Sequence, residues 1–181
     1  MRQGHQVPSG FTVEQLQVQI PRLRRYARAL TGSRDAADDL VQDALERAWT
    51  KRALWRPDSN LRAWLFAVMH NVFVNGVKRT RPMASLDALN EDGSVEPVAG
   101  GASAETDATL HDMSVALAQL PAEQRQVVLL VGLEQLTYAE AAEALEVPIG
   151  TVMSRLSRGR DRLRQLLDEH GSGRNGLRRV K

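Results

Sequence analysis

Apolar residues recur along this 181-residue chain with the spacing of helices, and the alternation typical of strands is nearly absent. The first helical stretch spans 12–30 and ends at Thr31-Gly32, where glycine suits a helix C-cap. Ser33 can cap a second helix, and a third runs from about Leu61 to Arg79 after a polar loop at 56–60. The second helix has the most regular apolar stripe: Ala37, Leu40, Val41, Ala44, Leu45, Ala48 and Trp49. The third offers Leu61, Trp64, Leu65, Val68, Val72 and Val77 for burial. We expect these three helices to form one compact domain, with Trp49 and Trp64 in its core.

A segment without periodicity follows Arg81-Pro82 and contains several glycines, prolines and acids. Its length of roughly 25 residues exceeds that of most loops inside compact domains, so it predicts a flexible linker. Helical patterning resumes near Ala108, and Pro121 is placed to begin a further helix. The expected fold is therefore all-α, with two small helical domains, an N-terminal bundle and a C-terminal helix-turn-helix domain, joined by a flexible acidic linker. The predicted boundaries are a disordered tail at 1–10, a domain at 11–80, the linker at 81–107, a domain at 108–169 and a basic tail at 170–181.

The C-terminal domain contains the pattern of a helix-turn-helix. The sequence 137–140, Thr-Tyr-Ala-Glu, has the form of a capping box and opens a short helix rich in small residues, which permit a second helix to pack closely. A break at 146–150 precedes a longer helix from Thr151 onward. In that helix one face is apolar or small, through Val152, Leu156, Gly159, Leu163 and Leu166. A short helix, a tight turn and a longer helix with a polar outer face are typical of a motif whose second helix enters the DNA major groove.

The outer face of this longer helix carries residues suited to DNA. Arginine can donate two hydrogen bonds to guanine, and hydroxyl groups can reach bases or phosphates. The plainer alternative is a solvated basic helix face, but the capping box and the small packing residues favour the DNA-binding interpretation. The candidate contacts are Thr151, Met153, Ser154, Arg155, Ser157, Arg158 and Arg162.

The charge distribution agrees with a basic end for nucleic acid. The net charge is only +2, yet 84–124 contains eight acids and no Lys or Arg, while 151–181 has nine basic residues against three acids. The absence of cysteine rules out disulfides and thiolate metal sites. No apolar run approaches the roughly 20 residues needed to span a bilayer, and Met1–Gly10 lacks the apolar stretch of a secretory signal. A cytoplasmic protein without membrane insertion is expected.

The motif sequence carries a family resemblance. Residues 138–142, Tyr-Ala-Glu-Ala-Ala, followed by 148–160, resemble the DNA-binding C-terminal domain of extracytoplasmic-function (ECF, group IV) sigma factors of the sigma-70 superfamily. The resemblance implies that this domain reads the promoter's minus-thirty-five element, with Thr151, Met153, Ser154, Ser157 and Arg158 at DNA-contacting positions. It gives Arg155 a phosphate-binding or structural role. Gly159 stands where alanine is usual in the family and should cost some helix stability.

Two stretches of the N-terminal domain are similar to the same family. The sequence 38–49 resembles the helix that docks on a coiled coil of the polymerase β′ subunit, and on charge alone it could equally be a solvated acidic face. The resemblance makes Asp39, Gln42, Asp43 and Glu46 the polymerase contacts. The sequence 60–79 resembles the helix that captures unstacked bases of the minus-ten element, and by the resemblance 56–60 would form the base-capturing loop. Such recognition requires polar edge-reading groups and cations. The matching residues are Asp58, Ser59, Asn60, Asn71, Asn75, Lys78 and Arg79.

The resemblance implies an alternative sigma factor that binds core RNA polymerase, through the β′ coiled coil and the β flap, and directs promoter recognition, DNA melting and initiation. An anti-sigma factor is a usual partner in the family, and the free protein is expected to be a monomer.

Three other functions compete with this interpretation. A decoy that sequesters an anti-sigma factor predicts loss of the DNA-facing arginines and usually a fused receiver domain, yet Arg155 and Arg158 are present and the chain begins directly at the first helix. A stand-alone repressor does not account for 38–49. An enzyme is disfavoured because the four histidines are isolated in sequence and no phosphate-cradling glycine loop occurs, so no catalytic residue, cofactor or metal is expected.

Overall fold

The structure is a computed structural model that describes residues 10–80 and 104–176, with side chains over 10–77 and 109–169. Within these ranges every regular element is a helix, which confirms the all-α prediction. The N-terminal unit contains α1 (Val13–Thr31), α2 (Arg34–Thr50), the short helix η1 (Arg52–Leu54) and α3 (Leu61–Thr80). The C-terminal unit contains α4 (Ala104–Ala118), α5 (Ala122–Val128), the π-helical turn η3 (Leu129–Leu133), α6 (Tyr138–Leu145) and α7 (Ile149–Gly176).

Local capping fixes where the first two helices begin and end. The Thr12 hydroxyl accepts a hydrogen bond from the Gln15 amide, and the Gln15 side chain bonds back to the Thr12 amide. Gly32 ends α1 with a φ of 71°, a left-handed conformation that glycine adopts without steric cost. The Ser33 side chain then caps α2. These caps turn the chain sharply, so that α1 and α2 lie against each other.

Aromatic residues close one end of the N-terminal unit. Phe11 lies at the centre, with its ring 6.0 Å from that of Trp55 and 5.6 Å from that of Trp64. The expectation that Trp64 packs into the core is met in part, since its side chain is half-buried. The expectation for Trp49 was wrong. Trp49 is 40% exposed, touches Phe11 edge-on and carries the Arg52 guanidinium 4.8 Å above its ring, because Trp55 occupies the interior instead.

The helix α3 is buried over a wider arc than the sequence predicted. Leu65 and Val68 are buried as expected, but Phe66 and Met69 are buried as well. The Phe66 ring packs against Tyr26 of α1 at 5.0 Å, while another side of α3 meets α6 of the C-terminal unit. A helix enclosed on two sides needs no single apolar stripe, so periodicity alone underestimates its burial.

The C-terminal unit departs from the predicted boundaries at both ends. Helix α4 begins at Ala104, inside the predicted linker 81–107, of which 81–103 lies outside the described residues. Helix α7 continues to Gly176, so the start of the predicted tail 170–181 is helical. The predicted apolar face of α7 is confirmed, since Val152, Leu156 and Leu166 are almost fully buried.

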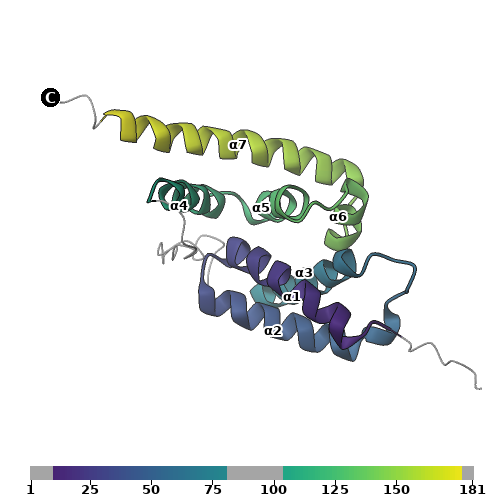
Figure 1. Ribbon diagram of the computed structural model, residues 1–181. Coiled ribbons are helices and arrows are strands. Elements are labelled where there is room, and N and C mark those ends of the chain that lie inside the picture. The colour runs from purple at the N-terminus through teal and green to yellow at the C-terminus, as the bar shows by residue number, and fades with distance from the viewer. Residues whose placement is uncertain (1–9, 81–103, 177–181) are drawn as a thin grey trace, which may run out of the picture.

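The two units pack against each other in layers, as Figure 1 shows. Helix α1 contacts α4, α5 and η3, and α3 contacts α6. Helix α7 lies along the far side of the C-terminal unit, and α2 lies along the opposite outer side of the molecule (Figure 1). We call this packing of the two units the closed arrangement. No pattern in the sequence predicted this packing.

Candidate nucleic-acid and polymerase interfaces

The helix-turn-helix is formed by α6 and α7, and its local geometry follows from the capping box. The Thr137 hydroxyl accepts from the Glu140 amide at 3.2 Å, and the Glu140 carboxylate accepts from the Thr137 amide at 2.8 Å. The hydrogen bond from the Thr137 amide, together with those that the Asn60 side chain and the Thr137 hydroxyl donate, holds the pKa of the Glu140 carboxyl below its ordinary value. Glu146 ends α6 with a φ of 54°, a left-handed conformation unusual for a residue with a side chain. The chain therefore turns from α6 toward α7 without a glycine at the C-cap of α6.

The outer face of α7 is open to solvent. Ser154, Ser157, Arg158 and Arg162 are exposed, and Met153 is 53% exposed although it is apolar. Thr151, at the start of the face, is half-buried. An exposed methionine among hydroxyl and guanidinium groups gives the face both hydrogen-bonding and apolar contacts, the combination that base edges in the major groove accept.

Arg155 differs from the other predicted DNA contacts. Its side chain is only 24% exposed, and its guanidinium lies 2.6 Å from the Glu123 carboxylate of α5. This ion pair joins α7 to the helix beneath it. The sequence left two roles open for Arg155, phosphate binding and a structural role. The ion pair with Glu123 favours the structural role.

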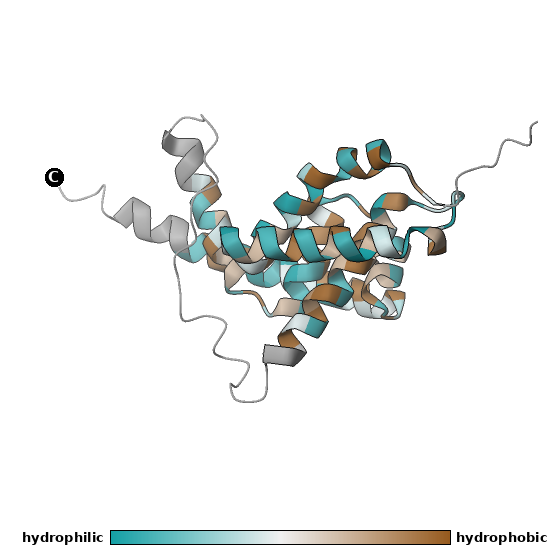
Figure 2. Ribbon diagram, turned by 90° about the horizontal axis from the view of Figure 1, so that it is seen from below, coloured by the Kyte–Doolittle hydropathy of each residue, from teal (hydrophilic) through white to brown (hydrophobic). Residues whose placement is uncertain are grey.

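The predicted polymerase contacts form an acidic face on α2. Asp39, Gln42, Asp43 and Glu46 are all exposed, and the Gln42 amide donates to Glu46 at 3.3 Å. Figure 2 views the molecule from below, the side of α2, and much of the helix nearest the viewer has the colour of hydrophilic residues. The face lies on the side of the molecule away from the C-terminal unit (Figure 1), so it is accessible in the closed arrangement.

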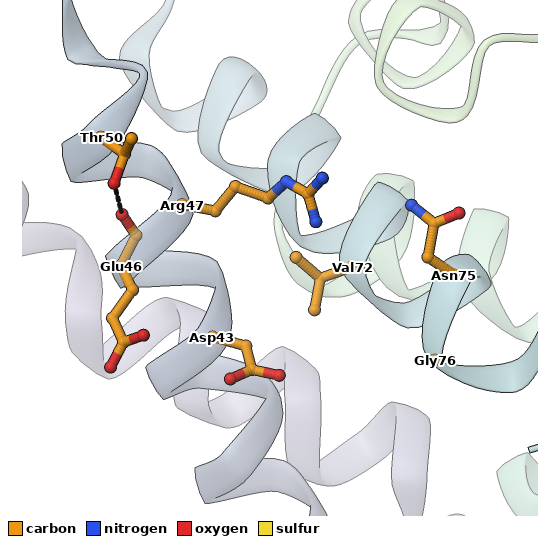
Figure 3. Close-up of a pocket in the computed structure, with 7 residues that line it drawn as sticks. All are labelled: Asp43, Glu46, Arg47, Thr50, Val72, Asn75 and Gly76. Atoms are coloured by element: carbon orange, nitrogen blue, oxygen red, sulfur yellow. Dashed lines mark hydrogen bonds between the residues drawn. The ribbon is translucent and has the colours of Figure 1, made fainter. Parts of the chain in front are cut away.

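A pocket between α2 and α3 brings two of the predicted sets together. Asp43 and Glu46 of α2 line it with Asn75 of α3, and Figure 3 shows Arg47 reaching from α2 toward α3. The sequence did not predict that the acidic docking face and a minus-ten residue would meet. Lys78 and Arg79 follow on the same helix, and their side chains lie outside the described residues.

The other predicted minus-ten residues lie at the interface between the units. In the loop before α3, Asp58 pairs with Arg56 at 2.9 Å, and Ser59 is exposed. The Asn60 side chain donates to the Glu140 carboxylate, and the Asn71 side chain donates to the Glu146 carboxylate at 3.0 Å. Two of the predicted base readers therefore already have partners on α6 or at its C-terminal end.

Sequence reasoning missed the charged residues that join the two units. Glu134 is fully buried (0% exposed) and lies between Arg25, at 2.7 Å, and Arg22, at 3.8 Å, both on α1. Arg125 of α5 donates to the Leu30 carbonyl of α1 at 2.8 Å and to two carbonyls of its own unit. The one signal in the sequence is that Glu134 stands among apolar residues, between Leu133 and Leu136.

Within the described residues, no group of three or more histidine, cysteine, aspartate or glutamate side chains is placed to hold a metal ion. In the same part of the chain, no helix has the length and apolar character needed to cross a membrane.

An acidic face on α2, a polar and cationic face on α7 and an all-helical fold in two regions agree with the sigma-70 resemblance of the sequence. Comparison with known proteins agrees. Residues 16–70 match the family described as "Sigma2 domain of PhyR", and residues 110–163 match "Sigma-70, region 4".

Curated relatives are similar over most of their length. The ECF RNA polymerase sigma factor EcfG of Rhodopseudomonas palustris is 34% identical over 154 residues, which cover 84% of this chain and 83% of the relative. The ECF sigma factor SigM of Mycobacterium tuberculosis is 34% identical over 156 residues, 84% of this chain and 75% of the relative. The chain therefore belongs to the ECF RNA polymerase sigma factors, which are non-catalytic specificity factors of transcription.

A solved structure is similar across both units. The sigma factor RpoE of Bartonella quintana, in complex with the anti-sigma factor NepR, is 36% identical and superposes with a TM-score of 0.70, covering 86% of this chain and 95% of that one. The structure of CnrH in complex with the cytosolic domain of CnrY has the same fold at 24% identity and a TM-score of 0.63.

Proposed function

We propose that this ECF sigma factor binds RNA polymerase and promoter DNA through three surfaces. The acidic face of α2 docks on the β′ coiled coil of core RNA polymerase, and the C-terminal domain engages the β flap. The loop 56–60 and α3, with Asn71, Asn75, Lys78 and Arg79, capture the minus-ten strand. The outer face of α7 reads the minus-thirty-five element. We assign docking through α2 and capture of the minus-ten strand to a domain at 11–80, and we assign the β flap contact and reading of the minus-thirty-five element to a domain at 108–169.

The observation that carries this proposal is that two solvent-exposed faces, one on α2 and one on α7, have opposite charge. The α2 face presents carboxylates, which suit a basic protein partner and repel DNA phosphates. The α7 face presents Arg158 and Arg162 among hydroxyl groups, which suit DNA. Because the two faces lie on opposite outer sides of the molecule (Figure 1), polymerase and DNA can be bound without competing for one surface.

Run-off transcription with core polymerase tests the assignment. Wild type is compared with Arg158→Ala and with Asp43→Ala/Glu46→Ala on candidate promoters, including that of its own gene. We expect Arg158→Ala to weaken promoter binding about tenfold while holoenzyme assembly stays unchanged, since one base or phosphate contact is lost. The acidic double variant should weaken holoenzyme assembly instead.

Arg164→Ala is the matched control for the arginine change. Arg164 is exposed on the same helix, outside the predicted DNA contacts, and pairs with Asp161 at 3.3 Å. It should transcribe as wild type does. Failure of wild type to initiate on every promoter would contradict the proposed function, and equal losses for Arg158→Ala and Arg164→Ala would contradict the assigned DNA face.

We also propose control by an anti-sigma factor, because relatives of this fold are found in complexes with NepR and with CnrY. Co-purification of the chain with the product of a neighbouring gene, followed by loss of transcription when that product is added back, tests this proposal. A partner that leaves transcription unchanged would count against it.

A second candidate function is a sigma-like decoy for an anti-sigma factor. The match of residues 16–70 to the sigma2 domain of PhyR favours it, and PhyR of Bartonella quintana is described as an anti-anti-sigma factor. The exposed Arg158 and the intact outer face of α7 favour the sigma factor instead. The same transcription assay separates the two, since a decoy never supports initiation.

A further inference from the structure

Two large apolar side chains are exposed in the first turns of α7, on a helix whose outer face is otherwise polar. Ile149 is 50% exposed and Met153 is 53% exposed. Because they are four positions apart, they lie one helical turn apart on the same flank of the helix. The core contacts of this part of α7 are made by Val152 and Leu156, which are almost fully buried. Packing of the helix therefore does not account for the apolar character of Ile149 and Met153.

The surroundings of this pair are those of a DNA-binding surface. Residues 149–162 contain four arginines and one acid. Arg158 and Arg162 are exposed on the following turns, and the exposed Ser154 adjoins Met153. The core of a protein-docking patch is depleted of charged residues, whereas DNA phosphates require cations on the same face as the base readers. The occupant that fits the pair and its surroundings is the major groove of duplex DNA.

The major groove offers an exposed apolar side chain one favourable partner. The donor and acceptor groups of the base edges lose hydration against an aliphatic chain or a thioether, whereas the C5-methyl group of thymine is apolar. Residues four positions apart on a helix are about 6 Å apart along its axis, and successive base pairs are about 3.4 Å apart. Ile149 and Met153 together therefore span about two base-pair steps, enough to contact the methyl groups of two nearby thymines.

The hydroxyl group of Ser154 favours the same base pair by a separate observation. It donates to the Thr151 carbonyl at 3.0 Å, so its lone pairs remain to accept a hydrogen bond. The amino donors in the major groove belong to adenine and cytosine, and only adenine is paired with a base that carries a methyl group. An acceptor beside an apolar side chain therefore matches an A·T pair better than a G·C pair.

We propose that Ile149 and Met153 read the C5-methyl groups of thymine, while Ser154 accepts from the amino group of adenine. The minus-thirty-five element of this protein then contains A·T pairs where the first turns of α7 enter the groove. Arg158 and Arg162, farther along the helix, bind guanine or phosphate. This inference rests on the proposed function, because it assigns part of the face that reads the minus-thirty-five element.

Removal of single methyl groups from the DNA tests the proposal. Holoenzyme, assembled from the full chain and core polymerase, first selects its element from promoters randomised at the minus-thirty-five position. Each thymine of the selected element is then replaced by deoxyuridine, which keeps the base pairing and removes only the C5-methyl group. We expect promoter binding by wild type to fall about fourfold at one or two positions, the effect of one buried methyl group.

The same replacements are measured with variants of the two apolar residues. Met153→Ala and Ile149→Ala should each lose the response to deoxyuridine at the position that the residue reads, because the partner of the methyl group is gone. Met153→Leu keeps an apolar side chain and should keep the response. Ser157→Ala, at an exposed polar position on the same face, is the matched control and should also keep it. Circular dichroism checks that the variants are folded.

The possible failures are distinguishable. If no thymine replacement changes binding although Arg158→Ala still weakens it, the methyl reader is overturned while the proposed function stands. Weaker holoenzyme assembly by Met153→Ala, with the deoxyuridine response unchanged, would mean that the pair docks on protein, and it also overturns the reader. If wild type neither binds nor initiates on any promoter, the proposed function fails and the methyl reader fails with it.

Discussion

At residue 159 two helices approach so closely that a hydrogen is the only side chain that fits. A Cβ added to Gly159 of α7 would lie 2.8 Å from a methyl group of Val128 on α5 and 3.4 Å from the Cβ of Gln124. The helix-propensity cost of this glycine, about 1 kcal/mol relative to alanine, is therefore offset by closer packing of α5 on α7. The expectation that Gly159 only weakens the helix is incomplete.

Gly159→Ala should lower the free energy of unfolding by about 1 kcal/mol, because overpacking costs roughly 1–3 kcal/mol and exceeds the propensity gain. Urea unfolding measures the change. Gly76→Ala in α3 is the control, since its added Cβ meets no atom within 4 Å, and it should leave stability equal or slightly higher. A gain of stability in Gly159→Ala equal to that of the control would contradict the packing role.

The two arginines Arg155 and Arg158 should respond differently to removal. Arg155 is paired with Glu123 and mostly buried, so Arg155→Ala should lower both the unfolding temperature and promoter binding. Arg158→Ala should lower promoter binding alone, since its side chain is exposed. Thermal unfolding and binding to duplex promoter DNA are measured on both variants. Together they separate a structural role from a DNA contact. An unchanged unfolding temperature in Arg155→Ala would show that the Glu123 pair contributes nothing.

At the scale of elements, the start of α6 depends on one reciprocal cap. Thr137 and Glu140 exchange hydrogen bonds that satisfy amides at the helix N-terminus. Helix α6 is only eight residues long, too short to be stable by itself, so the cap and the packing on α3 and α7 decide whether it forms.

Thr137→Ala should cost about 1 kcal/mol of unfolding free energy, the usual value of a lost N-cap. Thr50→Ala is a matched control, because the Thr50 hydroxyl only bonds back to the Glu46 carbonyl at 2.9 Å at the exposed end of α2. Urea unfolding of both variants gives the comparison. Equal effects would mean that the capping box adds nothing beyond the loss of a hydroxyl.

At the scale of the whole molecule, the closed arrangement should depend on pH through His70. Burial lowers the pKa of this α3 histidine below its ordinary value of 6.5, and Arg155 lowers it further while Glu146 opposes the shift. Its Nδ1 is buried without a hydrogen-bond partner. The neutral imidazole is therefore favoured when the units are packed together.

A depressed histidine pKa means that the more open states bind the proton more readily, so the closed arrangement is fully stabilised above about pH 6.5 and weakens as the pH falls. A pair of spin labels on Val18→Cys of α1 and Gln165→Cys of α7, two exposed positions in a chain without cysteine, reports the distance between the units. This distance should lengthen between pH 7.5 and 5.5. His70→Gln should flatten this dependence, and His111→Gln, at an exposed position, should preserve it. A pH profile that is identical in all three proteins would exclude His70 as the source.

Sequence patterns alone were enough to predict which segments are helical, where most of them begin and end, and which residues lie on the acidic face of α2 and the outer face of α7. These features are local. Caps such as Thr137-Glu140, the αL glycine at 32 and the apolar stripe of α7 act between residues a few positions apart, so their effects can be read from spacing. The resemblance to ECF sigma factors then predicted the functions of these residues.

What each helix packs against could be learned only from the three-dimensional arrangement. The burial of Phe66 and Met69, the exposure of Trp49, the close approach at Gly159 and the pairing of Glu134 with Arg25 join residues from different elements. In the last case the partners are 109 positions apart. Such contacts depend on the three-dimensional arrangement of whole helices, which no local pattern specifies. For this reason the sequence predicted two separate DNA-binding units, while the structure shows that Glu140 and Glu146 of one unit accept hydrogen bonds from Asn60 and Asn71 of the other.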